Sequence, residues 1–174
     1  KTLYHKNTTM KLLKRLALAV LLIAGLAAPS QAALPSVGLK DTNGNAIDTA
    51  TLSNDGKPFV ISFFATWCKP CLRELKAIHE LYPDWQDETG MRLIAVSIDE
   101  AQTMNKVKPL ADAEGWEYQV LLDPNREFAR QMGVQMVPHI FVFDGEGNTL
   151  ETRTGYTDGS ENHIIELIRQ SLNK

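Results

Sequence analysis

The chain has 174 residues, with 18 Lys and Arg, 21 Asp and Glu and a net charge of −3. The first 32 residues hold five of the basic side chains and none of the acidic ones, which leaves 13 basic against 21 acidic residues and a net charge of −8. Such an acidic domain repels phosphate backbones and anionic lipid, so no nucleic-acid partner is expected.

The two cysteines, Cys68 and Cys71, are three positions apart. A bridge between them would close too short a loop to stabilise a domain of roughly 140 residues, which is large enough to bury its own core. The pair is therefore expected to serve chemistry rather than folding.

The N-terminal segment has the pattern of an export signal. A basic stretch precedes an apolar run of 11 residues, 16–26, and the small residues Ser30 and Ala32 follow before an expected cleavage site. We predict a signal peptide over residues 1–32, with residues 1–9 as an upstream extension before Met10, and one domain over residues 33–174. An uncleaved membrane anchor is the alternative, although a membrane span needs roughly 20 residues. A lipid anchor is not expected because the cleavage region lacks cysteine.

From residue 37 onward, strand patterns alternate with helix patterns. The first two strands flank the hairpin signal Asn43-Gly44. The expected strands are residues 37–40, 46–48, 58–65, 92–98, 118–122, 140–143 and 150–156. The expected helices are residues 70–87, residues 101–115, a short helix capped by Asp123 or Asn125 and ending at Gly133, and a last helix capped by Ser160. This order predicts an α/β domain with a mixed central sheet flanked by helices.

Cys68 and Cys71 are placed for thiol–disulfide exchange. Cys68 falls where a buried strand ends and a helix begins, so unpaired N–H groups and the helix dipole favour its thiolate. Cys71 follows one turn deeper, where it can resolve a mixed disulfide. Pro70 fits the first helical turn, and the exposed charge of Lys69 is expected to have a small effect.

A structural disulfide and half of a zinc site are the alternatives. Zinc needs about four ligands. None of the four histidines, His5, His79, His139 and His163, has ligand spacing to the cysteines. No metal and no cofactor are therefore expected.

The segment Phe-Phe-Ala-Thr-Trp-Cys-Lys-Pro-Cys at residues 63–71, with Val137-Pro138 ahead of a strand, resembles the thioredoxin superfamily. The resemblance implies that Pro138 is cis and shapes the substrate groove. It also implies that the Val137 backbone pairs with an extended client peptide. Trp67 is expected to shield Cys68 and line that groove. A plain turn proline and a core tryptophan are the alternatives.

Two departures from plain thioredoxin are similar to the TlpA/ResA-like group of exported bacterial thioredoxins. The first is a helix-strand insert at about residues 101–122, besides the N-terminal hairpin. The second is Ser62, which stands where thioredoxin has a buried Asp. The resemblance implies that Glu74 replaces this acid, with burial raising its pKa so that it can take the proton of Cys71. An exposed Glu74 paired with Arg73 or Lys76 is the alternative.

The expected function is therefore an exported thiol–disulfide oxidoreductase. It would reduce disulfides of periplasmic client proteins, with apocytochrome c as one candidate, and would draw electrons from a membrane donor. A disulfide oxidase or isomerase is an alternative, and so is a non-catalytic module that binds a client or copper. A peroxidase of the related peroxiredoxin branch is disfavoured, because its Thr-x-x-Cys pattern would not need Cys71.

Overall fold

A computed structural model describes residues 34–173. The predicted signal peptide, its cleavage site and the alternative membrane anchor lie outside these residues. Within the described part, none of the helices has the length and hydrophobicity of a membrane span.

Within residues 34–173, seven strands form one mixed sheet in the order β2-β1-β5-β4-β3-β6-β7. The strands are β1 (Gly38–Asp41), β2 (Ala46–Asp48), β3 (Phe59–Phe64), β4 (Arg92–Ser97), β5 (Gln119–Leu122), β6 (His139–Phe143) and β7 (Thr149–Thr154). β3, β4 and β5 run parallel, while β1, β6 and β7 pair antiparallel with their neighbours. The sequence-based expectation of a mixed α/β sheet in a thioredoxin-like fold is confirmed.

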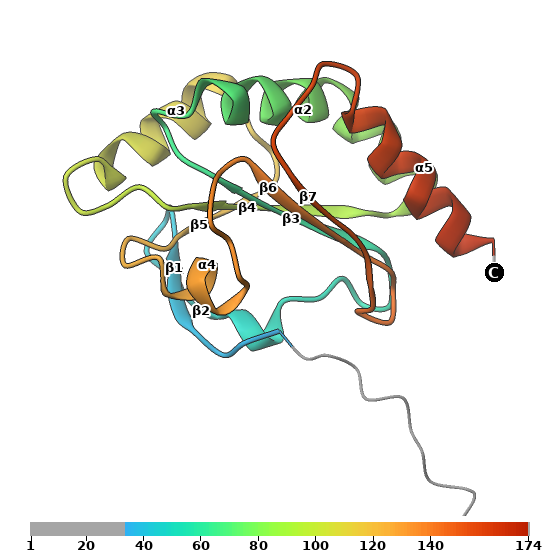
Figure 1. The fold of residues 1–174 in the computed structure, drawn as a ribbon, viewed down its shortest axis with the longest axis horizontal. Helices are drawn as coiled ribbons and strands as arrows, with labels where there is room; N and C mark the ends of the chain where they lie inside the picture. Colours follow the sequence, from blue (N-terminus) through green and yellow to red (C-terminus); the bar gives the residue numbers. More distant parts are fainter. Residues whose placement is uncertain (1–33, 174) are drawn as a thin grey trace, which may run out of the picture. The chain divides into compact units, whose positions relative to one another are not determined.

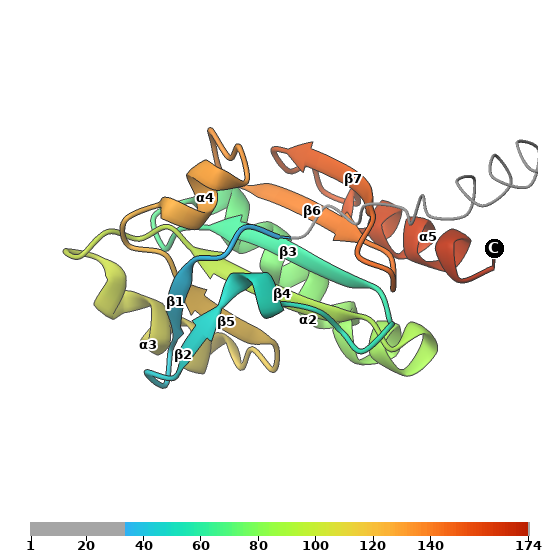
Figure 2. The ribbon, with the colours of Figure 1, turned by 90° about the horizontal axis from the view of Figure 1, so that it is seen from below.

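The helices cover both faces of this sheet. They are α2 (Lys69–Thr89), α3 (Val107–Glu114), α4 (Glu127–Gln131) and α5 (Glu161–Leu172). Figure 1 shows α2, α3 and α5 on one face of the sheet and α4 on the other. Figure 2, seen from below, shows α4 beside the start of β6. β3 and β6 are therefore covered from both sides, and every residue of these two strands is buried.

The N-terminal hairpin and the insert both exist. β1 and β2 pair across Asn43-Gly44, and β1 extends the sheet by pairing with β5 of the insert. The predicted helix at residues 101–115 was too long, however. A short 3₁₀ turn, Met104–Lys106, precedes α3. Pro109 is the third residue of α3, and a proline without an N–H fits the first turn of a helix but not its interior.

Two predicted helix caps had different outcomes. The Asp123 side chain accepts hydrogen bonds from the N–H groups of Glu127 and Ala129 at 2.8 and 2.9 Å, so it does stabilise the start of α4. Ser160 makes no such bond, because its backbone is already helical, with φ −70° and ψ −15°. The Glu161 carboxylate instead accepts the Gly159 N–H at 3.0 Å. Ser160 therefore occupies the N-cap position of α5, as predicted, but its side chain does not cap the helix.

Candidate active site

Cys68 and Cys71 form a disulfide at the start of α2. β3 ends at Phe64, and the chain then turns so that the Cys68 N–H donates to the Ala65 carbonyl at 3.0 Å. Cys68 is the N-cap of α2, and its sulfur accepts the Cys71 N–H at 3.3 Å. This N–H and the helix dipole stabilise a thiolate on Cys68.

The two sulfurs differ in how exposed their residues are. Cys68 retains 6% of its surface, whereas Cys71 retains none. Trp67, directly before them, is 63% exposed, which excludes the core tryptophan considered from the sequence. Cys68 and Trp67 are therefore more accessible from solvent than Cys71.

Val137 and Pro138 lie at the neighbouring strand end. Phe63 of β3 lies opposite His139 of β6 in an antiparallel register. Continuing this register by two residues places Pro138 beside Phe64 and Val137 beside Ala65, at the turn into Cys68. The Val137–Pro138 peptide bond is cis, as the resemblance implied.

His139 belongs to the sheet rather than to the reaction centre. Its Nδ1 shares a hydrogen bond of 2.8 Å with the Thr154 hydroxyl, and its ring packs on Phe141 with centroids 4.8 Å apart. Burial lowers its pKa.

Glu74 is buried in the face of α2 that packs on the sheet and retains 1% of its surface. It follows Cys71 by one helical turn, so the two side chains share a face of α2. Burial raises the pKa of Glu74 to about 7, and Arg153 and the Ser62 hydroxyl oppose this rise. An exposed Glu74 paired with Arg73 or Lys76 is thereby excluded.

Sequence reasoning missed Arg153, which is the actual ion-pair partner of Glu74. Its Nη2 donates to Glu74 Oε1 at 3.2 Å. The signal was obscure because Arg153 lies 79 positions away on a strand of mixed exposure. An alternation of strand residues would have placed it on the covered face of β7 only once the register with β6 was known.

Sequence reasoning also missed Asp99, which follows the last residues of β4. Asp99 retains 1% of its surface. It accepts hydrogen bonds from the N–H and hydroxyl of Thr66 and from the Ser97 hydroxyl. It thus ties the end of β4 to the turn that carries Trp67 and Cys68.

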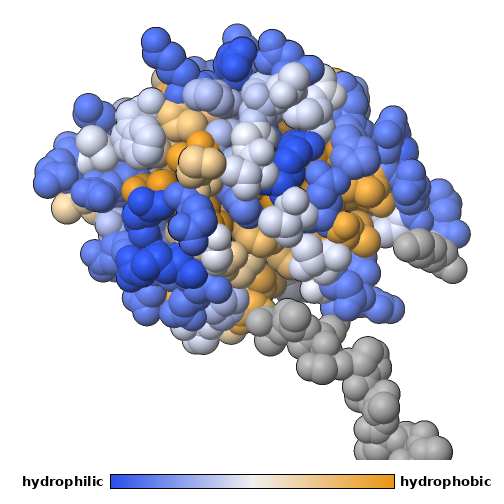
Figure 3. Space-filling model, in the orientation of Figure 1, coloured by the Kyte–Doolittle hydropathy of each residue, from blue (hydrophilic) through white to orange (hydrophobic). Residues whose placement is uncertain are grey.

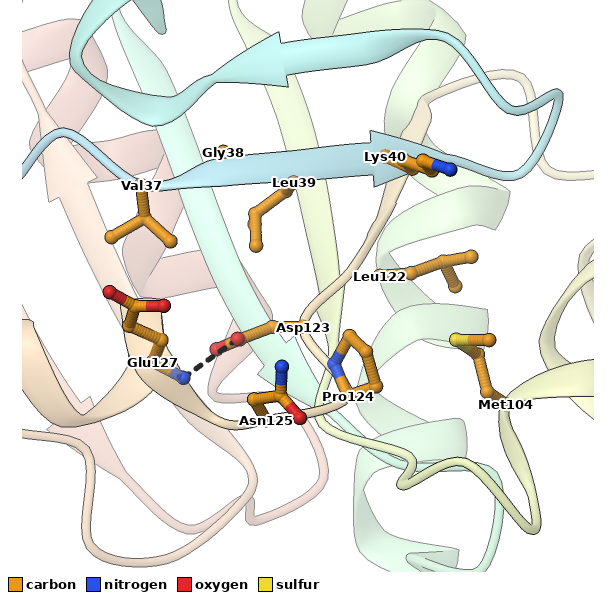
Figure 4. A pocket seen from close by; sticks show the side chains of 10 residues that line it. All are labelled: Val37, Gly38, Leu39, Lys40, Met104, Leu122, Asp123, Pro124, Asn125 and Glu127. Atoms are coloured by element: carbon orange, nitrogen blue, oxygen red, sulfur yellow. Dashed lines mark hydrogen bonds between the residues drawn. The ribbon is translucent and has the colours of Figure 1, made fainter.

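Two hollows lie near the ends of the parallel strands. One, of about 290 Å³, adjoins the redox centre and is lined by Trp67, Ile98, Glu100, Gln102, Thr103 and Arg126. The other, of about 330 Å³, lies between β1 and the start of α4 (Figure 4), and its lining includes Leu39, Met104 and Pro124 but no site residue. The Asp123 carboxylate in this second hollow already accepts a hydrogen bond from the backbone N–H of Glu127 (Figure 4). Of these two hollows, the first lies beside the redox centre, since Trp67 lines it.

The described residues contain no cluster of three or more His, Cys, Asp or Glu side chains that could hold a metal ion. The face seen in Figure 3 is mostly hydrophilic, with apolar side chains in small groups.

The model of the AhpC/TSA family matches residues 30–151. The chain belongs to the AhpC/TSA family. ResA, a thiol–disulfide oxidoreductase of Bacillus anthracis, is 31% identical over 121 residues, which are 70% of this chain and 67% of ResA. ResA of Bacillus subtilis is 29% identical over 136 residues, covering 78% of this chain and 73% of the relative.

Solved structures of other proteins share this fold. An uncharacterized thioredoxin-like protein from Porphyromonas gingivalis is 58% identical, with a TM-score of 0.73 over 82% of this chain and 93% of its own. StoA from Bacillus subtilis has the same fold at 19% identity, with a TM-score of 0.61 over 77% of this chain and 96% of StoA. This AhpC/TSA family member is therefore a thiol–disulfide oxidoreductase of the ResA type, with Cys68 and Cys71 as its redox pair.

Proposed function

We propose that this oxidoreductase works outside the cytoplasm, in the periplasm, as a reductant of disulfides in client proteins. The observation that carries the proposal is the pairing of Cys68, which keeps 6% of its surface, with the fully buried Cys71, next to the buried acid Glu74. This arrangement suits a dithiol that gives two electrons to a client and ends as the disulfide.

The reaction proceeds in two exchanges. The Cys68 thiolate attacks one sulfur of the client disulfide, so that a mixed disulfide forms and one client thiolate leaves. Cys71 then loses its proton to the Glu74 carboxylate and attacks the Cys68 sulfur. The second client thiolate leaves and takes up a proton, and the Cys68–Cys71 disulfide remains.

The surroundings of the cysteines favour the reducing direction. A strong oxidant owes its potential to a stabilised reduced form. Among the described contacts, the Cys68 sulfur accepts one backbone N–H, from Cys71. Lys69 is exposed, so solvent screens its charge. The negative charge of ionised Glu74 also disfavours a thiolate on the adjacent Cys71. Weak stabilisation of the dithiol corresponds to a low reduction potential.

The client is expected to approach as an extended peptide. The Val137 backbone is available for strand addition beside the disulfide. Trp67 and the hollow of about 290 Å³ beside it can take client side chains on the other side of Cys68. Apocytochrome c before haem attachment is one candidate client, and re-reduction of Cys68–Cys71 requires a donor on the membrane.

The periplasmic location rests on the signal pattern of residues 1–32. The mature protein should begin near Ala33 and fractionate with soluble periplasmic proteins. Intact-mass measurement on purified envelope fractions checks this. A full-length, membrane-bound species would show that residues 1–32 anchor the protein in the membrane and are not cleaved.

The reduction potential of the Cys68–Cys71 couple tests the direction. Equilibration with glutathione buffers, followed by alkylation and mass measurement, gives the potential directly. A reductant should lie near the thioredoxin value of about −270 mV, whereas a value near −120 mV would make the protein an oxidase.

A further inference from the structure

Arg153 lies in a row of residues that crosses three strands beneath α2. It is opposite Ile140 of β6, and Ile140 is opposite Ser62 of β3. Directly opposed residues project from the same face of a sheet. Arg153 and Ser62 both act on the carboxyl group of Glu74, so Glu74 lies over this row.

Arg153 also binds groups on other elements. Its Nη1 donates to the Ser160 carbonyl at 3.0 Å and lies 3.7 Å from Glu151 Oε1. Glu151 in turn lies 2.8 Å from Nε2 of His163 on α5. Arg153 and Glu151 are 20% and 22% exposed, whereas Glu74 is 1% exposed. The guanidinium thus spans the boundary between solvent and the buried acid.

The ion pair between Arg153 and Glu74 leaves hydrogen-bonding atoms unused on both side chains. Among the described residues, Nε of Arg153 and Oε2 of Glu74 are both buried without a hydrogen-bond partner. One donor and one acceptor of the same pair are therefore unused. A carboxylate and a guanidinium can form two parallel hydrogen bonds, so this pair has the groups needed for a second bond.

The other groups described around Glu74 do not supply the positive charge that Arg153 provides. Ser62 on β3 offers a neutral hydroxyl, and Glu161 on α5 adds a like charge. Tyr156, between β7 and α5, donates its hydroxyl to Glu161 at 3.0 Å. Arg153 is the cation that acts on this carboxyl group.

We propose that Arg153 is a positioning residue for proton transfer in this enzyme. It stabilises the ionised carboxylate of Glu74 before the proton transfer, closing the second hydrogen bond while Glu74 carries its negative charge, and it orients that carboxylate toward the helix face of Cys71. When Glu74 takes the proton of Cys71 and becomes neutral, this second hydrogen bond is released. The inference rests on the proposed role of Glu74 as the proton acceptor.

The first test is the titration of Glu74 in the oxidised protein, followed by the ¹³C shift of its side-chain carboxyl group. The wild-type pKa of Glu74 is about 7. In Arg153→Gln it should rise by about one to two units, as expected on removing a close cation. In Glu151→Gln it should fall, because a second carboxylate no longer competes for Arg153. If Arg153 only stabilised the fold, the two substitutions would not shift the pKa of Glu74 in opposite directions.

The second test is turnover with dithiothreitol and a model disulfide such as insulin. In Arg153→Gln the acid limb of the pH profile should move up with the Glu74 titration, lowering turnover at pH 7 by about fivefold to fiftyfold. Above pH 9 the loss should disappear. Arg153→Lys keeps the charge but not the paired hydrogen bonds, and it should recover part of the loss.

The decisive comparison adds Arg153→Gln to Glu74→Gln. If Arg153 acts through Glu74, the second substitution should change the pH profile no further. Arg169→Gln, which removes a surface pair with Glu88 at 2.6 Å, is the matched control and should leave the profile unchanged.

The results distinguish failure of the role of Arg153 from failure of the role of Glu74. A Glu74 titration that is unchanged in Arg153→Gln, together with slow Glu74→Gln, overturns the role of Arg153 alone. Wild-type turnover in Glu74→Gln overturns the proton acceptor itself, and with it the role of Arg153. The reduction potential decides separately whether the enzyme is a reductant.

Discussion

The Asp99 carboxylate accepts hydrogen bonds from both donors of Thr66, the backbone N–H at 2.7 Å and the hydroxyl at 2.6 Å. The Ser97 hydroxyl adds a third hydrogen bond at 2.9 Å. Since Thr66 immediately precedes Trp67 and Cys68, this buried acid fixes the turn that presents the nucleophile.

Asp99→Ala should destabilise the protein by about 1–3 kcal/mol, because it leaves buried donors on Thr66 and Ser97 without an acceptor. Urea unfolding of the oxidised protein measures this loss. Asp112→Asn, which breaks only an exposed pair with Lys108, is the control and should stay within about 0.5 kcal/mol of wild type. Equal effects in the two variants would mean that Asp99 does not anchor the turn.

Cys71→Ser should trap clients as mixed disulfides on Cys68, and Cys68→Ser should abolish insulin reduction. The reason is the difference in burial, since only the Cys68 side of the disulfide reaches the surface. Non-reducing gels and mass spectrometry of the trapped species provide the measurement. Full turnover by Cys71→Ser would rule out the two-thiol mechanism.

Trp67→Ala should weaken client binding more than it slows chemistry. The indole is 63% exposed and lines the hollow beside Cys68. Loss of one aromatic contact should raise KM for a peptide disulfide about tenfold while kcat changes less than about threefold. Leu172→Ala, another exposed apolar residue at 51%, is the control and should have no effect on KM. A fall in kcat at constant KM would instead assign Trp67 to the chemical step.

The parts of this fold that could be predicted from the sequence have local signals. The apolar run of β3, the hairpin at Asn43-Gly44 and the helix after Cys68 follow from patterns that extend over a few residues. The position of Cys68 at a strand-to-helix junction then predicts its chemistry. The cis bond before Pro138 was implied by the family resemblance and not by a local pattern.

The parts that could not be predicted depend on contacts between distant segments. Arg153 reaches Glu74 only because β7 pairs with β6 in one particular register. The burial of Asp99 could not be predicted, because acidic residues are rarely buried unless they are paired. Its partner, Thr66, lies 33 positions earlier. Such pairings follow from the tertiary fold.

Glu74→Gln should slow turnover near pH 7 by about tenfold to a hundredfold, at the low end of general-base contributions. The isosteric amide keeps the shape of the side chain but cannot accept the proton of Cys71. The loss should shrink at high pH, where Cys71 ionises without help. Turnover of the reduced enzyme with insulin from pH 6 to 9 measures the pH profile. A wild-type pH profile in this variant would show that Glu74 does not accept the proton of Cys71.

The raised pKa of Glu74 should also appear in the stability of the oxidised protein. The pKa of this carboxyl group is 4.5 in its ordinary state and about 7 in the fold. Between these two values the folded protein binds a proton that the unfolded chain has released, so stability must fall as the pH rises. The contribution is fully present below pH 4.5 and is lost by about pH 7, for a total of roughly 3 kcal/mol.

Glu74→Gln cannot titrate, so this part of the pH dependence should be missing from it. The free energy of unfolding of wild type minus that of Glu74→Gln, from urea titrations at pH 4.5 to 8, should therefore decrease by about 3 kcal/mol across the window. Glu80→Gln lies on the same helix but is exposed, and its difference from wild type should stay nearly flat. If the Glu74→Gln difference is equally flat, the buried carboxyl group is not neutral below pH 7, and it could not take up the proton of Cys71 in the way proposed.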